Sequence, residues 1–300
     1  MSIEVQGLTK TYKDKHAVRD VSFTVQPGKV TGFLGPNGAG KSTTMRLIVG
    51  LDRPTSGRAL IDGTKYAAFP APLREVGALL DARAAHKSRT ALNYLTSIAA
   101  THRIPRSRVD EVLEATGLTT VAEKRVGGFS LGMGQRLGIA AALLGDPGTL
   151  ILDEPVNGLD PEGVTWVREL LDALAAEGRT VFLSSHLLSE LALIADHVVI
   201  IGRGEIIADS AISALTEQGG SKVRVRTGDI TALSNRLAAP GVVITSSEQD
   251  LVEIDGLSAE QIARAAREAD LLLTELTPLH QTLEEAYNQL TRDAVEYISA

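Results

Sequence analysis

A glycine-rich segment near the start of the chain constrains its fold most strongly. Residues 35–42 read GPNGAGKS and fit the pattern GxxxxGK[ST]. They follow the apolar run VTGFL and precede STTMRLIVG, in which apolar residues recur with helical spacing. A loop of this kind between a strand and a helix directs backbone N–H groups, a helix N-terminus and a lysine toward one place, where phosphate groups bind. The segment therefore predicts a nucleotide-binding α/β core.

The residues of this loop have different predicted roles. Backbone N–H groups from Gly38 to Thr43 approach the phosphates, Lys41 reaches the β- and γ-phosphates, and Ser42 reaches Mg²⁺. The predicted nucleotide-binding residues here are Gly35, Pro36, Asn37, Gly38, Ala39, Gly40, Lys41, Ser42 and Thr43. The alternative is a glycine-rich turn before a helix, but a chance match in a chain of this length arises in only about one per cent of cases.

Two acidic residues stand at the end of a second buried strand. The run LIL is followed by Asp153 and Glu154, and α/β sheets bind their ligands at the carboxyl ends of their strands. We predict that Asp153 holds Mg²⁺, usually through water, and that Glu154 orients and polarises the water that attacks the γ-phosphate. The alternative, a solvated acidic strand end, carries little weight beside a phosphate-binding loop.

Three further residues are weaker candidates. His186 follows the strand VFLSS, so it emerges at the same edge of the sheet and is within reach of the γ-phosphate. Taken alone, a histidine is more often a structural or surface residue. Tyr12 and Val18, in the opening strands, offer a flat surface to adenine, although a core or surface position is equally plausible for the tyrosine.

Composition bounds the class of protein and its partners. The chain has 300 residues, 44% hydrophobic and 22% charged, which is typical of a soluble globular protein. A formal charge of −7 argues against nucleic acid as a partner. The absence of cysteine suits a reducing cytoplasm. No apolar run approaches the roughly 20 residues that span a bilayer, so membrane association is expected to come from a partner.

The pattern of elements predicts two domains. Short apolar runs fill residues 2–34, helical periodicity fills about 90–128, and the strands TLILDEP and TVFLSSH flank a helix over 162–177, which indicates parallel βαβ units. Beyond residues 219–220 the order βαββαβ suggests a ferredoxin-like sandwich. Capping boxes at Ser258/Gln261 and Thr282/Glu285 mark its helix starts. We place the domains at 1–218, with a helical subdomain over about 82–140, and at 221–300.

The motifs together resemble a known family. The phosphate loop, FSLGMGQR, LILDEP, NGLD and SSH follow one another as in the nucleotide-binding domains of ABC transporters, over about residues 2–218. The chain looks most like the daunorubicin- and bacitracin-resistance type of exporter ATPase, whose ABC-2 permease is a separate chain, and TLEEAY at Thr282 to Tyr287 is similar to the tail of that group. The resemblance implies a P-loop NTPase with a RecA-like core, an antiparallel β subdomain and a helical subdomain. It also implies ATP and Mg²⁺ as cofactors.

The resemblance further implies a head-to-tail homodimer with two ATP molecules at the seam. By position, Ser130 and Gly132 would contact the γ-phosphate in trans, Asp160 would lie in the D-loop, and Tyr12 would stack on adenine. The sequence departs from the family at two places. The signature segment LSGGQ reads FSLGM over 129–133, which weakens the expected closure, and Asp81 replaces the usual Q-loop glutamine if Val76 and Gly77 align. An acid at position 81 still binds Mg²⁺ or its water but cannot donate a hydrogen bond.

The leading hypothesis is an ATP-hydrolysing subunit that drives a separate permease and exports a drug, antibiotic or lipid-like compound. Such a subunit would lie on the cytoplasmic face of the membrane and be soluble when expressed alone. The alternatives are a soluble ABC ATPase that acts on ribosomes or DNA, and an ATP-sensing regulatory subunit. For the C-terminal domain, a dimer-stabilising or merely appended role is favoured over a regulatory ligand site.

Overall fold

The computed structural model describes residues 1–217, 222–248, 250–279, 284–285 and 287. These residues form two compact units, Met1–Ala211 and a second that begins at Ile212.

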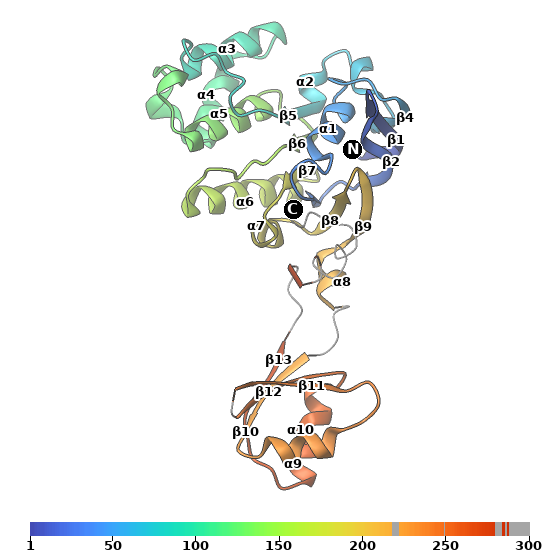
Figure 1. The fold of residues 1–300 in the computed structure, drawn as a ribbon. Coiled ribbons are helices and arrows are strands. Elements are labelled where there is room, and N and C mark those ends of the chain that lie inside the picture. The colour runs from blue at the N-terminus through green and yellow to red at the C-terminus, as the bar shows by residue number, and fades with distance from the viewer. Residues whose placement is uncertain (218–221, 249, 280–283, 286, 288–300) are drawn as a thin grey trace. The chain divides into compact units, whose positions relative to one another are not determined.

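A six-stranded sheet lies at the centre of the first unit (Figure 1). Its first five strands are parallel, and the edge strand β9 runs antiparallel to β8. Every residue of β3, β6 and β7 is buried, as expected for a parallel sheet covered on both faces. The order across the sheet is β5 (Val76–Leu79), β6 (Thr149–Leu152), β7 (Thr180–Ser185), β3 (Val30–Leu34), β8 (His197–Gly202) and β9 (Glu205–Ala211).

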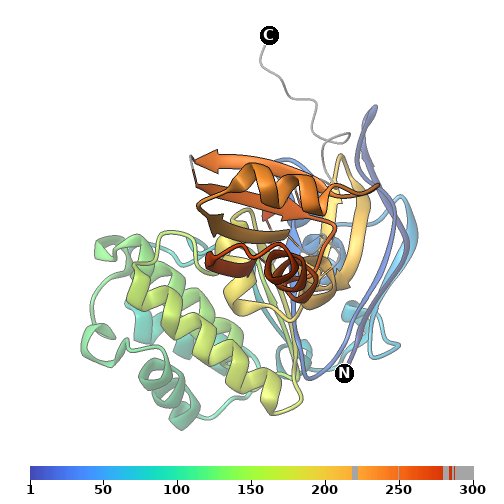
Figure 2. The ribbon, with the colours of Figure 1, turned by 90° about the horizontal axis from the view of Figure 1, so that it is seen from below.

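An antiparallel sheet of three strands packs against this sheet. Its order is β2 (Lys15–Val25), β1 (Ile3–Tyr12) and β4 (Ser56–Ile61), and Figure 2 shows these strands, in blue, curving along one side of the unit. The rings of Phe23, Phe33 and Phe182 meet between the two sheets with centroids 5.3–5.5 Å apart. Their burial joins the two sheets in one hydrophobic core.

Three helices pack on one another beside the sheets (Figure 1). They are α3 (Ala91–Thr101), α4 (Arg106–Ala115) and α5 (Leu131–Leu143), with 3₁₀ turns at Thr119–Val121 and Val126–Gly128. Thr90 caps the first of them, because its hydroxyl oxygen accepts the N–H of Asn93 at 3.1 Å. The helical periodicity predicted over about 90–128 is confirmed by α3 and α4, and α5 begins beyond that range.

The remaining helices flank the two sheets. The helix predicted over 162–177 is confirmed as α6, and the helix predicted after the glycine-rich loop is α1. The bounds are α1 (Lys41–Ile48), α2 (Pro72–Glu75), α6 (Pro161–Ala176) and α7 (Leu188–Ile194), with a 3₁₀ turn at Tyr66–Ala68.

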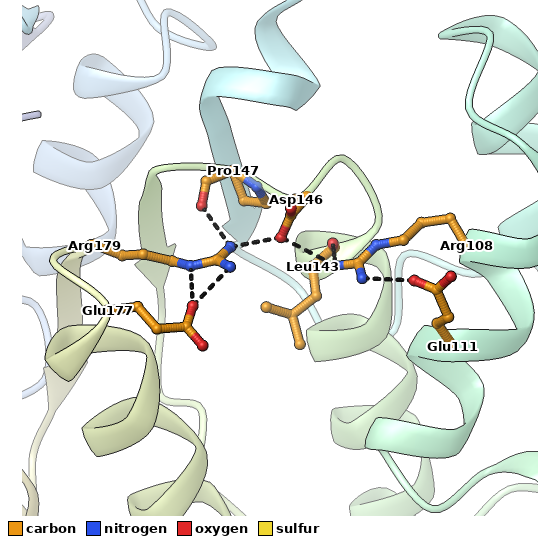
Figure 3. Close-up of polar contacts among 7 residues, drawn as sticks. All are labelled: Arg108, Glu111, Leu143, Asp146, Pro147, Glu177 and Arg179. Atoms are coloured by element: carbon orange, nitrogen blue, oxygen red, sulfur yellow. Dashed lines mark hydrogen bonds and ion pairs between the residues drawn. The ribbon is translucent and has the colours of Figure 1, made fainter.

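A charged cluster joins α4 to the central sheet (Figure 3). One carboxylate oxygen of Asp146, in the loop between α5 and β6, lies 3.3 Å from Arg108 Nη2 and 2.8 Å from Arg179 Nη1. Arg108 also donates to the carbonyl of Leu143, and Arg179 to that of Pro147. The hydrogen bond from Arg179 lowers the pKa of Asp146; burial opposes this shift, and the charges of both arginines add to it.

The second unit begins with α8 (Ile212–Glu217) and continues as an antiparallel sheet with two helices. The predicted βαββαβ order is confirmed, as is the capping box of Ser258 and Gln261. Valines and isoleucines from one face of β10 and β12 pack with Leu233 and Ile262 of the helices. The box predicted at Thr282/Glu285 and the final helix predicted from Thr282 lie outside the fully described residues. The elements are β10 (Lys222–Thr227), α9 (Ile230–Leu237), β11 (Val243–Glu248), β12 (Leu251–Asp255), α10 (Ala259–Glu268) and β13 (Leu273–Leu279), with the strands in the order β11-β12-β10-β13.

Candidate functional site

The glycine-rich loop joins β3 to α1 at the carboxyl edge of the central sheet. Lys41 begins the helix, and its side chain is only 6% exposed because it turns back under the loop. Its ammonium Nζ donates to the carbonyl of Gly35 at 2.6 Å and lies 3.4 Å from that of Pro36. The lysine charge is therefore held against the backbone carbonyls at the base of the loop.

Two glycines of the loop are required by their surroundings. Gly40 has φ +112°, and a Cβ placed there would lie 2.6 Å from the carbonyl of Ala17. A Cβ on Gly35 would clash with the carbonyl of Ile201. Both positions therefore need glycine, so that the loop can pack closely against β2 and β8. Pro36, Asn37, Gly38 and Ser42 are exposed, while Ala39 is buried.

Asp153 and Glu154 follow β6 at the same edge of the sheet. The hydroxyl of Ser184, in β7, donates to Asp153 Oδ1 at 2.5 Å and accepts the backbone N–H of Glu154 at 3.0 Å. Glu154 Oε1 lies 3.6 Å from Lys41 Nζ. The structure thus brings together the lysine of the loop and both acids that the sequence singled out.

His186 lies on the other side of the Glu154 carboxylate. Its Nδ1 is 2.7 Å from Glu154 Oε2, because β6 and β7 are neighbours and each residue follows the end of its strand. Glu190, on α7, adds a third charge that the sequence did not point to. Burial raises the pKa of Glu190; the charge of His186 opposes this shift, and that of Glu154 adds to it.

Tyr12 lies at the end of β1 with 46% of its surface exposed. Its hydroxyl donates to Asp52 Oδ2 at 3.0 Å, and Asp52 also accepts from Arg46 Nε at 2.8 Å. Lys10 Nζ lies 4.8 Å from the centre of the tyrosine ring. An exposed aromatic ring fixed at its hydroxyl end suits the adenine role predicted for it.

The prediction for Val18 is wrong. Its side chain is fully buried in the core between the two sheets, and a Cβ added to Gly40 would touch it at 3.5 Å. A register shift in the pairing of β1 and β2 turns this valine inward, so it has no exposed surface to offer adenine. Val18 supports the loop from below instead.

Ser130 and Asp160 cap two helices. The hydroxyl oxygen of Ser130 accepts the N–H of Met133 at 3.2 Å at the start of α5, and Asp160 Oδ1 accepts the N–H of Gly163 at 2.9 Å at the start of α6. A Cβ on Gly132 would lie 3.2 Å from Leu159, so the two capped segments pack together.

Leu131 occupies the place of the first signature glycine and is 46% exposed. Its side chain covers Gly158, where a Cβ would clash with it.

Asp81 stands two residues beyond β5, at the same edge of the sheet as Asp153. Its Oδ1 accepts the N–H of Arg83 at 2.8 Å, and its side chain is exposed. The backbone N–H of Asp153 donates to the carbonyl of Leu79, at the end of β5, at 2.7 Å. Asp81 is therefore near the acids in the fold, with its carboxylate used in a local turn.

The chain is similar to transport ATPases over nearly its full length. It is 36% identical over 295 residues to YdbJ, an uncharacterized ABC transporter ATP-binding protein of Bacillus subtilis (strain 168), a match that covers 96% of this chain and 95% of that protein. It is 40% identical over 232 residues to the bacitracin transport ATP-binding protein BcrA of Bacillus licheniformis, with 76% and 75% covered. The ABC transporter family model matches residues 18–157. This chain belongs to the ABC transporter ATP-binding proteins.

Solved ABC cassettes share the fold of the first unit. A cassette solved as a dimer with ADP and phosphate bound matches with a TM-score of 0.64 and 25% identity, covering 70% of this chain and 98% of that one. As a member of this family, the chain binds and hydrolyses ATP. A second family model, described as a domain of unknown function, matches residues 221–284. Within the described residues, no helix has the length and apolar character needed to cross a membrane.

The sequence analysis missed Gln135 and Ser184. The side chain of Gln135 is only 3% exposed, and its Nε2 donates to the carbonyl of Glu154 at 2.5 Å. A polar residue on the apolar face of α5 was the available signal, because a buried glutamine normally has a specific partner. For Ser184 the signal was a pair of serines at the end of the buried strand TVFLSS.

Proposed function

We propose that this chain is the ATP-hydrolysing subunit of an exporter whose permease is a separate membrane protein. The observation that carries this function is the arrangement of Lys41, Glu154 and His186 at one edge of the central sheet. Glu154 lies 3.6 Å from the lysine and 2.7 Å from the histidine. A phosphate held by the lysine therefore lies within reach of a carboxylate that can orient water.

Within this site each group has a separate task. Lys41 and the backbone of the loop bind the β- and γ-phosphates, and the ring of Tyr12 stacks on adenine. Glu154 accepts a hydrogen bond from the attacking water and polarises it. His186 holds the Glu154 carboxylate through Nδ1, and when both ring nitrogens carry a proton, Nε2 on the far side of the ring can donate to the γ-phosphate.

The residues present fit Mg²⁺. Asp153 gives one carboxylate oxygen to Ser184, and its other oxygen has no hydrogen-bond partner in the described part of the chain. Across that part, no group of three His, Cys, Asp or Glu residues can hold a metal ion by protein ligands alone. This suits Mg²⁺, which normally takes one or two protein oxygens together with phosphate oxygens and water. Ser42 and Asp153 would hold the ion, Asp81 would reach it through water, and the ion would neutralise phosphate charge.

We further propose that two copies close head to tail on ATP. Ser130 and Gly132 of one copy would contact the γ-phosphate bound to the other, with Asp160 at the seam. The solved dimer with ADP and phosphate supports this arrangement. Opening after hydrolysis would move α3, α4 and α5 and so drive the permease from the cytoplasmic face of the membrane.

For the cargo we propose a peptide antibiotic or similar compound, because BcrA is a bacitracin transport protein. The second unit we assign to the ferredoxin-like class. Its βαββαβ order and the strand order β11-β12-β10-β13 support that class. We assign to it a role in holding the dimer together.

The test is to purify the chain from its native membranes and identify its partners by mass spectrometry. We expect an integral-membrane protein to be recovered with the chain in equal amount. When the gene for the chain is deleted, that recovery and bacitracin tolerance should both be lost. Re-expression of the wild type should restore tolerance, and re-expression of Glu154→Gln at the same level should not. Recovery with ribosomes or DNA and no membrane protein would refute the transporter role.

A further inference from the structure

We propose that Gln135 and Ser184 are positioning residues that fix the backbone of Glu154 and thereby aim its carboxylate. This inference rests on the catalytic role proposed for Glu154. Each acts on the glutamate through its backbone.

The backbone of Glu154 has a conformation that a glutamate rarely adopts. Its φ is +51°, in the left-handed region where most side chains crowd the following carbonyl. Such strain at a functional residue persists only where neighbouring groups hold it. The contacts around this residue should therefore show what holds it.

Both backbone groups of Glu154 are held by side chains from other elements. Ser184 Oγ in β7 accepts its N–H at 3.0 Å, and Gln135 Nε2 in α5 donates to its carbonyl at 2.5 Å. The N–H of Asn157 also donates to this carbonyl at 3.1 Å. The residue is thus fixed on both sides of its Cα, while its carboxylate extends to Lys41 and His186.

The serine hydroxyl serves both acids. Ser184 is fully buried. Its hydroxyl oxygen accepts a hydrogen bond from the backbone N–H of Glu154, and its O–H donates one to Asp153 Oδ1. A single hydroxyl therefore sets the spacing between the acid assigned to Mg²⁺ and the acid assigned to water. Alanine at this position would remove this contact from both acids.

Gln135 makes the conformation of Glu154 depend on α5. The glutamine lies five residues after Ser130, which caps the same helix. A shift of α5 along its axis would withdraw the amide from the carbonyl of Glu154. The aim of the carboxylate therefore depends in part on the position of α5.

The alternative is that Gln135 is a buried residue whose polar group is merely satisfied. That role affects folding, so its loss would lower stability and ATP binding as much as turnover. A positioning role lowers turnover with little effect on ATP binding, because the phosphate contacts come from other residues.

The experiment uses the full-length protein and compares Gln135→Met with Gln135→Glu. Methionine keeps the length of the side chain and removes the donor. We expect its kcat to fall by about tenfold to a hundredfold, as for a misplaced catalytic group, with Kd for ATP changed less than about threefold. Gln26→Met, at an exposed glutamine, is the matched control and should behave as wild type.

The glutamate variant supplies a pH signature. When ionised, its carboxylate faces the carbonyl of Glu154 without a proton to donate, and when protonated it donates as the amide did. Because burial raises the pKa of such a group, kcat of Gln135→Glu relative to wild type should rise as the pH falls from about 8.5 to about 6. Gln135→Met should show no such rise. Ser184→Thr, which keeps a hydroxyl, should retain more turnover than Ser184→Ala.

Two results would overturn the inference. One is wild-type kcat in Gln135→Met; the other is an equal loss of kcat, ATP affinity and melting temperature without the pH signature. Glu154→Gln is measured beside these variants to separate the two proposals. Wild-type turnover in Glu154→Gln refutes the catalytic role and the positioning with it. If Glu154→Gln loses turnover while Gln135→Met keeps the wild-type kcat, only the positioning role is refuted.

Discussion

Lys41 and Glu154 form an ion pair beneath the glycine-rich loop, with Nζ 3.6 Å from Oε1. The pair is largely shielded from water, because the lysine is 6% exposed and the glutamate 23%. The group assigned to the γ-phosphate and the group assigned to water therefore attract each other directly. Negative phosphate oxygens compete with Glu154 for the same ammonium.

Glu154→Gln should slow turnover and tighten ATP binding. We expect kcat to fall about 10²–10⁴-fold, since the amide cannot act as a base. Kd for ATP should fall, because Lys41 loses a competing partner. Phosphate release and titration with a fluorescent ATP analogue measure the two effects. Unchanged kcat would contradict the assignment.

Lys41→Ala should lower the affinity of the protein for ATP. A hydrogen bond to a charged group contributes about 1.5–3 kcal/mol, so Kd for ATP should rise by about tenfold or more. Lys29→Ala removes an exposed lysine and is the matched control. Equal affinity in Lys41→Ala and in wild type would refute the placement of the phosphates, with equilibrium titration as the measurement.

Tyr12→Ala should weaken ATP binding through the lost ring. Base stacking on an aromatic ring contributes about 1–3 kcal/mol, which corresponds to roughly 5–150-fold in Kd. Tyr12→Phe keeps the ring and loses only the 3.0 Å hydrogen bond to Asp52, so its Kd should stay close to wild type. Calorimetric titration distinguishes the two. Similar losses in both variants would show that the hydroxyl, not the ring, matters.

Asp146 should stabilise the first unit in a pH-dependent way. Because its pKa lies below the ordinary 3.8, its contribution is complete above that value and is lost as the pH falls through the lowered one. Asp146→Asn should therefore cost stability at pH about 7, and the difference from wild type should narrow below pH about 4. Urea unfolding of both proteins at the two pH values measures this difference in the free energy of unfolding. A difference that grows on acidification would contradict the ion pairs.

Leu131→Gly should favour closure of the dimer. The leucine stands where the family signature has glycine, and its half-exposed side chain lies over Gly158. Removing this side chain should raise the fraction of dimer that forms with ATP in a Glu154→Gln background. Sedimentation or light scattering measures that fraction. Leu193→Gly, at another exposed leucine, should leave that fraction unchanged. No gain in Leu131→Gly would show that the leucine does not hinder closure.

Local patterns were enough to predict much of the fold and part of the site. The glycine loop, the acids after β6 and His186 all follow strand ends, and parallel strands bring their ends to one edge. Contacts between segments that are distant in the chain could not be predicted from these local patterns. Gln135 meets Glu154 across 19 positions of sequence, and Tyr12 meets Asp52 across 40.

The error at Val18 has a simple physical origin. Phe23 and Val25 alternate with polar residues in β2, and simple alternation from them would turn Val18 away from the core. Nearby Phe23 and Val25 share the inward face with Val18 only because register shifts interrupt the pairing of β1 and β2. A local irregularity in the ladder thus decides the direction of a side chain.

The carboxylate of Asp146 links α4 to the start of β7. Both guanidinium groups reach the same oxygen, at 3.3 and 2.8 Å, so one acid links the helix to the start of β7, in addition to the packing of α4 on α3 and α5. Loss of this one carboxylate would therefore break both ion pairs at once, so the charged link between α4 and the start of β7 depends on a single side chain.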